Sequence, residues 1–151
     1  NLGAQALLDL ENHHNFAWKE RHVVGGVERE VIVHRKGATP AGFGVFGIIP
    51  GSMGTGSFIV RGRGNPESFC SCSHGAGRAM SRHEATRRWH GSDIIEALFR
   101  RGILIRSPSF RGVAEEAPDA YKDVGAVVDV ADKAGLARKV AKLVPIVCIK
   151  G

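Results

Sequence analysis

The sequence contains no long apolar run and few aromatic residues. Its 151 residues are 43% apolar by a broad count but only 7% aromatic. No apolar stretch approaches the roughly 20 residues that cross a bilayer as a helix. The amino-terminal segment also lacks the basic region and following apolar stretch of a secretory signal. The composition therefore argues against a membrane protein and predicts one domain, residues 1–151, with a core of its own.

Cysteine is scarce, and the number of cysteines is odd. Cys70 and Cys72 are too close in sequence for a comfortable disulfide, which leaves Cys148 without an obvious partner. We interpret all three as reduced thiols, which predicts a cytoplasmic location. A Cys-x-Cys pair is also a weak metal motif, because zinc-binding pairs prefer at least two intervening residues. Core packing is the preferred interpretation of this pair.

Acidic residues are outnumbered, and glycine is abundant. The chain has 21 Lys and Arg against 15 Asp and Glu, a net charge of +6, and 20 glycines. A basic balance favours a polyanionic partner without identifying it. The glycines follow no collagen-like period, so they are expected in turns and at close backbone approaches.

The hydrophobic pattern predicts a mixture of helices and short strands. Apolar positions spaced by three and four favour a helix over 4–24, ended by Gly25-Gly26, and alternation favours a strand over 28–34. Further strands are expected at 45–49, 58–60, 103–105 and 144–149. Further helices are expected at 79–88, after a cap at Ser92 or Asp93, at 124–132 and at 136–143. Residues 107–118 are expected to form a loop. Without a regular βαβ alternation, the fold class is α+β.

Two glycine-rich segments, 51–57 and 73–78, are the densest candidate site. Backbone N–H groups in such segments can approach a phosphate closely, and serine hydroxyls can add bonds. Neither segment is a P-loop, because neither ends in Gly-Lys-Ser/Thr. His74 stands among small residues, with Arg78 and Arg82 expected behind it on one helical face. From spacing alone, His74 is a surface or capping residue, a metal ligand or a nucleophile.

Two other segments carry polar clusters. His13-His14-Asn15 lies in the expected first helix, where adjacent histidines point in different directions and a complete metal-ligand set is missing. In 34–39 (HRKGAT), Arg35 and Lys36 have the ingredients of an anion clamp, but they are equally consistent with a solvated charge pair.

Taken together, six motifs resemble the RtcB family of RNA 3′-phosphate ligases, in order and over nearly the whole chain. They are HHN at 13–15, HRKGAT at 34–39, PGSMGTGS at 50–57, SHGAGRAMSR at 73–82, EEAPDAYKD at 115–123 and the terminal KG at 150–151. The resemblance implies the carboxy-terminal part of an RtcB-like mixed fold. It further implies ligation of RNA 3′-phosphate or 2′,3′-cyclic phosphate ends to 5′-hydroxyl ends, in tRNA splicing or RNA repair, with GTP and Mn²⁺.

The resemblance also implies roles for individual residues. By motif, His74 is the catalytic residue that takes GMP covalently, and His14 is a metal ligand. The implied nucleotide-binding residues are Ser52, Ser57, Gly75, Ala76, Gly77, Tyr121 and Lys150. The residues implied to hold RNA phosphates are Lys36, Arg78 and Arg82.

The sequence departs from the family by lacking the upstream Asp, Cys and His motifs that build most of its metal centre. His14 alone cannot hold a catalytic manganese pair, so we expect a fragment or one half of a split protein, with a partly uncovered apolar stripe on its first helix. The expected partners are RNA (tRNA halves or broken RNA), the missing amino-terminal half of the ligase and an archease-type activator, with no membrane. The alternatives are a non-catalytic RNA-binding protein, a paralogue acting on another RNA, and a structural fragment.

Overall fold

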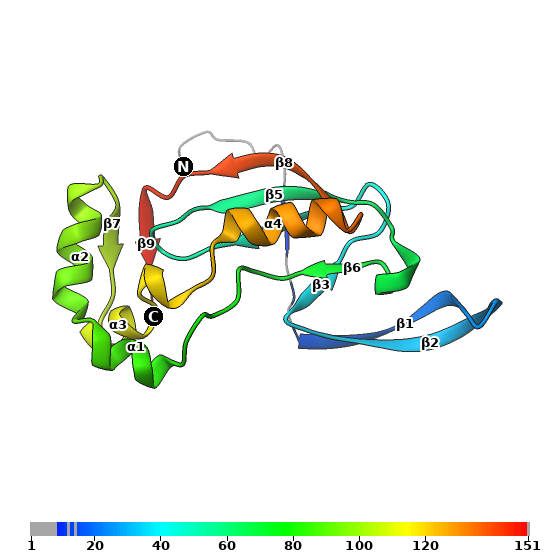
Figure 1. The fold of residues 1–151 in the computed structure, drawn as a ribbon, viewed down its shortest axis with the longest axis horizontal. Helices are drawn as coiled ribbons and strands as arrows, with labels where there is room; N and C mark the ends of the chain where they lie inside the picture. The colour runs from blue at the N-terminus through cyan, green and yellow to red at the C-terminus, as the bar shows by residue number, and fades with distance from the viewer. Residues whose placement is uncertain (1–8, 12, 14, 151) are drawn as a thin grey trace, which may run out of the picture.

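The computed structural model describes residues 9–11, 13 and 15–150. Three parts follow one another along its long axis: a β-hairpin at one end, a central sheet with a helix on it, and a group of short helices at the other end (Figure 1). The described residues therefore combine helices and strands, as the α+β prediction requires. Among them, no helix has both the length and the apolar character needed to cross a membrane.

The hairpin consists of β1 (Asn15–Val24) and β2 (Val27–Lys36), paired antiparallel along their full length. Gly25 and Gly26 form its turn with φ of 62° and 79°. A two-residue hairpin turn needs such left-handed backbone at both positions, which glycine adopts without steric cost. The helix predicted over 4–24 is wrong for residues 15–24, which are a strand, so the expected helical stripe does not exist there. Residues 1–8, 12 and 14 lie outside the described part of the chain.

Arg35 anchors the base of this hairpin. Its guanidinium is 2% exposed and donates to both carboxylate oxygens of Glu20 on β1, at 2.5 and 2.9 Å. It also donates to Ser71 Oγ and to the Phe69 carbonyl oxygen, both at 2.9 Å. The interpretation of Arg35 as half of an anion clamp is therefore wrong, because its donors bind groups of the protein. The side chain instead joins the hairpin to the segment that leads to His74.

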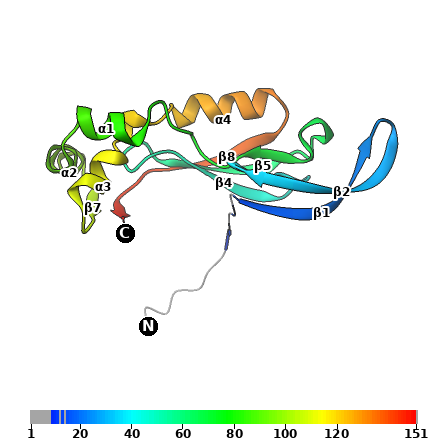
Figure 2. The same cartoon turned by 90° about the horizontal axis from the view of Figure 1, so that it is seen from below.

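The central sheet has the strand order β4 (Phe46–Pro50), β5 (Ser57–Gly62), β8 (Ala137–Leu143). Helix α4 (Val124–Lys133) lies along one face of it (Figure 2). The buried core between them includes Ile49, Val60 and Val128. The strands expected at 45–49 and 58–60 are confirmed, and so is the helix expected at 124–132. The helix expected at 136–143 is wrong, because α4 ends before Gly135 (φ 70°) and the following residues pair with β5.

The helical end contains α1 (Arg82–Arg88), α2 (Gly91–Arg100) and α3 (Phe110–Glu115). Two parallel strands, β7 (Leu104–Arg106) and β9 (Val147–Ile149), belong to the same part. A second buried cluster, which includes Leu98 and Val113, holds it together. The loop expected at 107–118 is wrong, since it contains α3 and reaches the short 3-10 helix η2 (Pro118–Ala120). Helix α2 begins earlier than expected, with His90 at the capping position.

A short antiparallel pair, β3 (Ala38–Pro40) with β6 (Ser71–Ser73), connects the hairpin to the rest. The turn before β6 contains the 3-10 helix η1 (Pro66–Ser68). Cys72 in β6 is buried in the first core cluster, and Cys70, Cys72 and Cys148 are all free thiols. This confirms the prediction that the three cysteines form no disulfide and that Cys72 packs in the core.

We predict that Asp123→Ala lowers the free energy of unfolding by about 1 kcal/mol. The Asp123 side chain caps α4 by accepting a hydrogen bond of 2.7 Å from the backbone N–H of Gly125. Asp119→Ala is the matched control, because Asp119 is an exposed aspartate in the neighbouring 3-10 helix η2, which has no side-chain cap. Urea denaturation of both variants checks this, and equal losses would contradict the capping role.

Candidate active site

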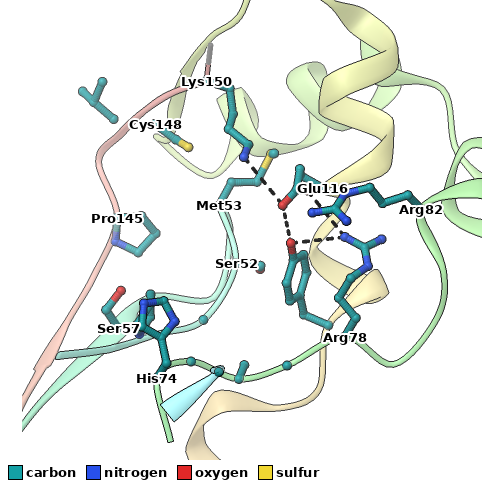
Figure 3. A pocket seen from close by; sticks show the side chains of 18 residues that line it. Ser52, Met53, Ser57, His74, Arg78, Arg82, Glu116, Pro145, Cys148 and Lys150 are labelled. Atoms are coloured by element: carbon teal, nitrogen blue, oxygen red, sulfur yellow. Dashed lines mark hydrogen bonds and ion pairs between the residues drawn. The ribbon is translucent and has the colours of Figure 1, made fainter. Parts of the chain in front are cut away.

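A cavity of about 770 Å³ opens between the central sheet and the helical end. Four segments form most of its lining: the β4–β5 loop, residues 74–78 after β6, Glu116 with Tyr121, and the chain after β8. Gly37 and Arg82 complete it. In the view of Figure 3, His74, Ser57 and Pro145 occupy one part of the cavity lining, and a cluster of charged side chains occupies another. Ten of the residues predicted for the site line it: Ser52, Ser57, His74, Gly75, Ala76, Gly77, Arg78, Arg82, Tyr121 and Lys150.

His74 directly follows β6, and its backbone is held by the neighbouring segments. Its N–H donates to the Gly37 carbonyl oxygen at 3.1 Å, and the N–H of Ala76 donates to the Pro50 carbonyl oxygen at 2.9 Å. The imidazole is half-buried and lines the cavity. The ligase interpretation requires open space beside this ring, and the cavity meets that requirement. The helix expected at 79–88 begins later than predicted, since α1 starts at Arg82 after its cap, Ser81, and His74 lies before it in a non-helical segment.

The glycine-rich loop between β4 and β5 is a tight turn closed on itself. The N–H groups of Gly51, Ser52, Gly54 and Thr55 donate to acceptors within the loop, at distances of 2.8 to 3.4 Å. A Cβ on Gly51 would lie 2.5 Å from the Gly56 carbonyl oxygen, so glycine is required at this position. These N–H groups are already used, contrary to the expectation that they cradle a phosphate. The hydroxyls of Ser52 and Ser57 are the polar side chains that this region contributes to the cavity.

Arg78 is also committed to protein acceptors. It donates to the carbonyl oxygens of Met80 at 3.0 Å and Glu115 at 2.7 Å, and to the hydroxyl of Tyr121 at 3.2 Å. Its guanidinium lies 5.0 Å from the centre of the Tyr121 ring. The backbones of Arg78 and Tyr121 also form an antiparallel bridge, so Arg78 does not lie on a helical face with Arg82. Arg78 therefore supports Tyr121, and contact with an RNA phosphate would cost some of these bonds.

The other predicted phosphate-binding cations are exposed. The Arg82 side chain is 64% exposed at the start of α1. Lys36 is exposed at the end of β2 and does not line the cavity, although Gly37 next to it does. Both side chains can reach an anion from solvent. Lys36 lies at the cavity edge rather than inside it.

Glu116 is the functional candidate that the sequence analysis missed. Its carboxylate accepts a hydrogen bond from the Tyr121 hydroxyl and lies 3.5 Å from Arg78 Nη1, 3.5 Å from Arg82 Nε and 3.7 Å from Lys150 Nζ. Figure 3 shows these groups converging on it. Glu116 stands inside the EEAPDAYKD motif, but no periodicity distinguishes it from Glu115. The only available signal was its place in that motif.

The surroundings of Glu116 keep it ionised. Burial by itself would raise the pKa of the Glu116 carboxyl. The hydrogen bond from Tyr121 and the charges of Lys150, Arg78 and Arg82 outweigh burial, so this pKa lies below its ordinary value of 4.5. Conversely, burial and the contact with Glu116 raise the pKa of Tyr121 above its ordinary value of 10.0. At neutral pH the pair is therefore a carboxylate and a neutral phenol.

This lowered pKa predicts a pH dependence of stability. A group with a depressed folded pKa contributes stability that is fully present above its unfolded pKa and is lost as the pH falls through the folded value. The free energy of unfolding of the wild type should therefore exceed that of Glu116→Gln near neutral pH, and the difference should shrink on acidification below 4.5. Urea denaturation over a pH series measures it. A difference that stays constant with pH would show that the carboxylate charge contributes nothing.

The described residues contain no group of three or more His, Cys, Asp or Glu side chains placed to hold a metal ion. His14, the predicted metal ligand, lies outside the described residues. The described part of the chain therefore does not form a manganese site by itself. The assignment of His14 stays a prediction.

Comparison with known proteins gives consistent matches. A family model described as tRNA-splicing ligase RtcB matches residues 2–151. The RNA-splicing ligase RtcB of Mycobacterium tuberculosis is 49% identical over 152 residues, which cover 91% of this chain and 35% of the relative. The tRNA-splicing ligase RtcB of Methanococcus maripaludis is 42% identical over 153 residues, covering 91% of this chain and 32% of the relative. The tRNA-splicing ligase RtcB of Pyrococcus furiosus is 45% identical over 166 residues, which cover 100% of this chain and 17% of the relative. The chain thus spans about a third or less of these relatives.

Proposed function

Because the chain belongs to the RtcB family, we propose that it is the nucleotide-linking part of a GTP-dependent RNA ligase. The reaction would join an RNA 3′-phosphate or 2′,3′-cyclic phosphate end to a 5′-hydroxyl end. The observation that carries the proposal is the position of His74. Its imidazole lines a cavity together with every residue that the resemblance assigns to the nucleotide.

The proposed chemistry proceeds in three displacements. First, a ring nitrogen of His74 attacks the α-phosphorus of GTP, forming a P–N bond as pyrophosphate departs and the imidazole loses a proton. Second, an oxygen of the RNA 3′-phosphate attacks the same phosphorus, the P–N bond breaks, and the departing imidazole regains a proton. Third, the 5′-hydroxyl oxygen attacks the RNA 3′-phosphorus, loses its proton and displaces GMP. A cyclic phosphate end would first add water to give the 3′-phosphate.

The residues of the cavity would bind and orient these reactants. Ser57 lines the same cavity as His74, and its hydroxyl could hold a phosphate oxygen of the nucleotide there (Figure 3). Tyr121 and Lys150 would contact the guanine nucleotide from the charged part of the cavity. Arg82 and Lys36 would hold RNA phosphates, since their exposed cations suit a polyanion. Holding both substrates in line with His74 would supply much of the rate enhancement.

Manganese enters the proposal only as an expectation from the family. It accepts mixed nitrogen and oxygen ligands and would polarise phosphoryl oxygens. The described residues do not fit a manganese site on their own, so none of the steps above is assigned to the metal. As the family resemblance implies, the remaining ligands would come from an amino-terminal region. We propose this region, an archease-type activator and RNA (tRNA halves or broken RNA) as partners.

Incubation with GTP and Mn²⁺ tests the proposal, with GTP labelled either at the α-phosphate or at the γ-phosphate. The chain should be assayed alone and together with the complementary family region, meaning the part of a full-length RtcB protein that this chain does not cover. We expect protein-bound label from α-labelled but not from γ-labelled GTP, labile in acid and stable in base, as a phosphoramidate is. The mixture should acquire label faster than the chain alone. RNA binding without such an adduct would instead favour a non-catalytic RNA-binding protein.

A further inference from the structure

Among the described residues that line the cavity, Glu116 carries the only carboxylate. Its side chain is 17% exposed, and its carboxylate oxygens lie within 3.7 Å of nitrogen atoms of three cationic side chains and of the Tyr121 hydroxyl. Oε1 faces Arg78 and Arg82, whereas Oε2 faces Tyr121 and Lys150. A single carboxylate therefore connects two residues predicted to bind the nucleotide, Tyr121 and Lys150, with two predicted to bind RNA, Arg78 and Arg82.

Its partners differ in their freedom to bind a ligand. The side chains of Arg82 and Lys150 are 64% and 40% exposed, so both can contact an anion while remaining close to Glu116. Arg78 is 20% exposed and already uses its donors on protein oxygens. Glu116 thus holds two ligand-accessible cations, Arg82 through Oε1 and Lys150 through Oε2. Its other two partners, Arg78 and Tyr121, pack against each other.

We propose that Glu116 is a positioning residue of this cavity, which holds Tyr121 and Lys150 for a guanine nucleotide and Arg82 for an RNA phosphate. The identity of the ligands rests on the proposed function. The role follows from the contacts themselves: Glu116 fixes the direction of the Tyr121 hydroxyl and keeps two long, flexible cationic side chains in one place. Side chains held in advance lose less conformational entropy on binding.

The sign of the effect on GTP binding separates positioning from simple charge. GTP is an anion, so removing a nearby negative charge would by Coulomb interaction alone tighten its binding. Loss of positioning acts in the opposite direction, because Lys150 and Tyr121 would then be ordered only when the nucleotide binds. We expect Glu116→Gln to weaken GTP binding by about tenfold, which corresponds to about 1.4 kcal/mol.

Calorimetric titration of the 151-residue chain with GTP measures this change. Glu115→Gln is the matched control: it removes the same charge one residue away, from a side chain that pairs with Arg111 and does not line the cavity. Glu115→Gln should leave GTP affinity unchanged. Equal or tighter GTP binding by a folded Glu116→Gln variant would overturn the proposal.

The chain offers a second readout that needs no ligand, because Tyr121 is its only tyrosine. The ultraviolet absorbance of tyrosinate therefore reports the ionisation of this one side chain. Glu116→Gln removes the charge that opposes ionisation, so tyrosinate should appear at lower pH than in the wild type. An unchanged titration would show that Glu116 does not hold the phenol and would overturn the proposal.

Tyr121→Phe covers the case in which Glu116→Gln fails to fold. It keeps the ring and removes only the hydroxyl that donates to Glu116, so it should also weaken GTP binding, and unchanged affinity would count against the proposal.

The outcome of these binding experiments is separable from that of the proposed function. If His74 takes up no GMP but Glu116→Gln still weakens GTP binding, the covalent mechanism fails and the positioning role stands. If His74 is labelled but GTP affinity does not depend on Glu116, the positioning role alone fails.

Discussion

Replacing His74 with Ala is expected to abolish covalent attachment of GMP, with a loss on the order of 10³-fold or more, as when other enzymes lose their nucleophile. The imidazole lines the cavity, and no other histidine does so among the described residues. Because the substitution shortens a half-buried side chain at the cavity wall, it should change stability little. Label transfer from α-labelled GTP, with Mn²⁺ and the complementary family region present, measures the effect.

His83→Ala is the matched control for this experiment. His83 is an exposed histidine on α1, close in sequence to the cavity residues but not among those that line it. The control should retain full label transfer. Comparable label on His74→Ala and on the wild type would show that another residue is the nucleophile.

Substitution of Arg35 should produce the largest loss of stability among the changes considered. Arg35→Met is expected to lower the free energy of unfolding by about 3 kcal/mol, because it removes the buried partner of an ion pair whose other member, Glu20, is half-buried. Glu20 would lose two hydrogen bonds, and Ser71 and the Phe69 carbonyl oxygen would lose one each. The base of the hairpin and the start of β6 would then separate more easily. Chemical denaturation followed by circular dichroism measures the change.

Arg21→Ala provides the control for Arg35→Met. Arg21 forms an ion pair with Glu28 on the same hairpin, but its side chain is 72% exposed, so its removal should cost only about 0–1 kcal/mol. The double variant Glu20→Leu/Arg35→Met should recover part of the loss, since it leaves no half-buried carboxylate without its Arg35 partner. Similar losses for Arg35→Met and Arg21→Ala would contradict the anchoring role.

The strands of the central sheet and helix α4 could be predicted from the sequence, because their apolar residues follow the expected periods. The hairpin could not be predicted from the spacing of apolar residues, since Trp18 and Arg21 also fit a helical spacing. The decisive signal was Gly25-Gly26 between two strand-forming runs, which is typical of a two-residue hairpin turn. Interpreting these glycines only as the end of a helix gave the wrong element.

Strand β8 shows a different limit of sequence reasoning. Its residues, from Ala137 to Leu143, are compatible with a short amphipathic helix, and no local feature excludes one. Pairing with β5, nearly 80 positions earlier in the chain, determines their structure. Such long-range pairing overrides local propensity and leaves no periodic trace when most of the strand is exposed, as it is here.

Motifs rather than periodicity pointed to the residues that line the cavity, whereas their individual roles stay predictions. The resemblance named His74, Ser57, Tyr121 and Lys150, and the cavity brings all four together. Predictions of which polar groups are free to bind a ligand were less accurate. Arg35 proved to be a buried anchor, and four N–H groups of the 51–57 loop donate to acceptors within the loop. Spacing shows which groups are present but not which of them are already bonded to one another.

The most direct test of the central claim, that His74 is the residue linked to GMP, is to map the adduct. Acid lability alone does not suffice, because Lys150 lines the same cavity and a lysine phosphoramidate is also labile in acid. The chain should be incubated with GTP, Mn²⁺ and the complementary family region, digested at alkaline pH and analysed by tandem mass spectrometry. The account predicts a GMP adduct on His74, in the peptide that contains residues 73–78. An adduct on Lys150 or elsewhere, with His74 unmodified, would contradict it.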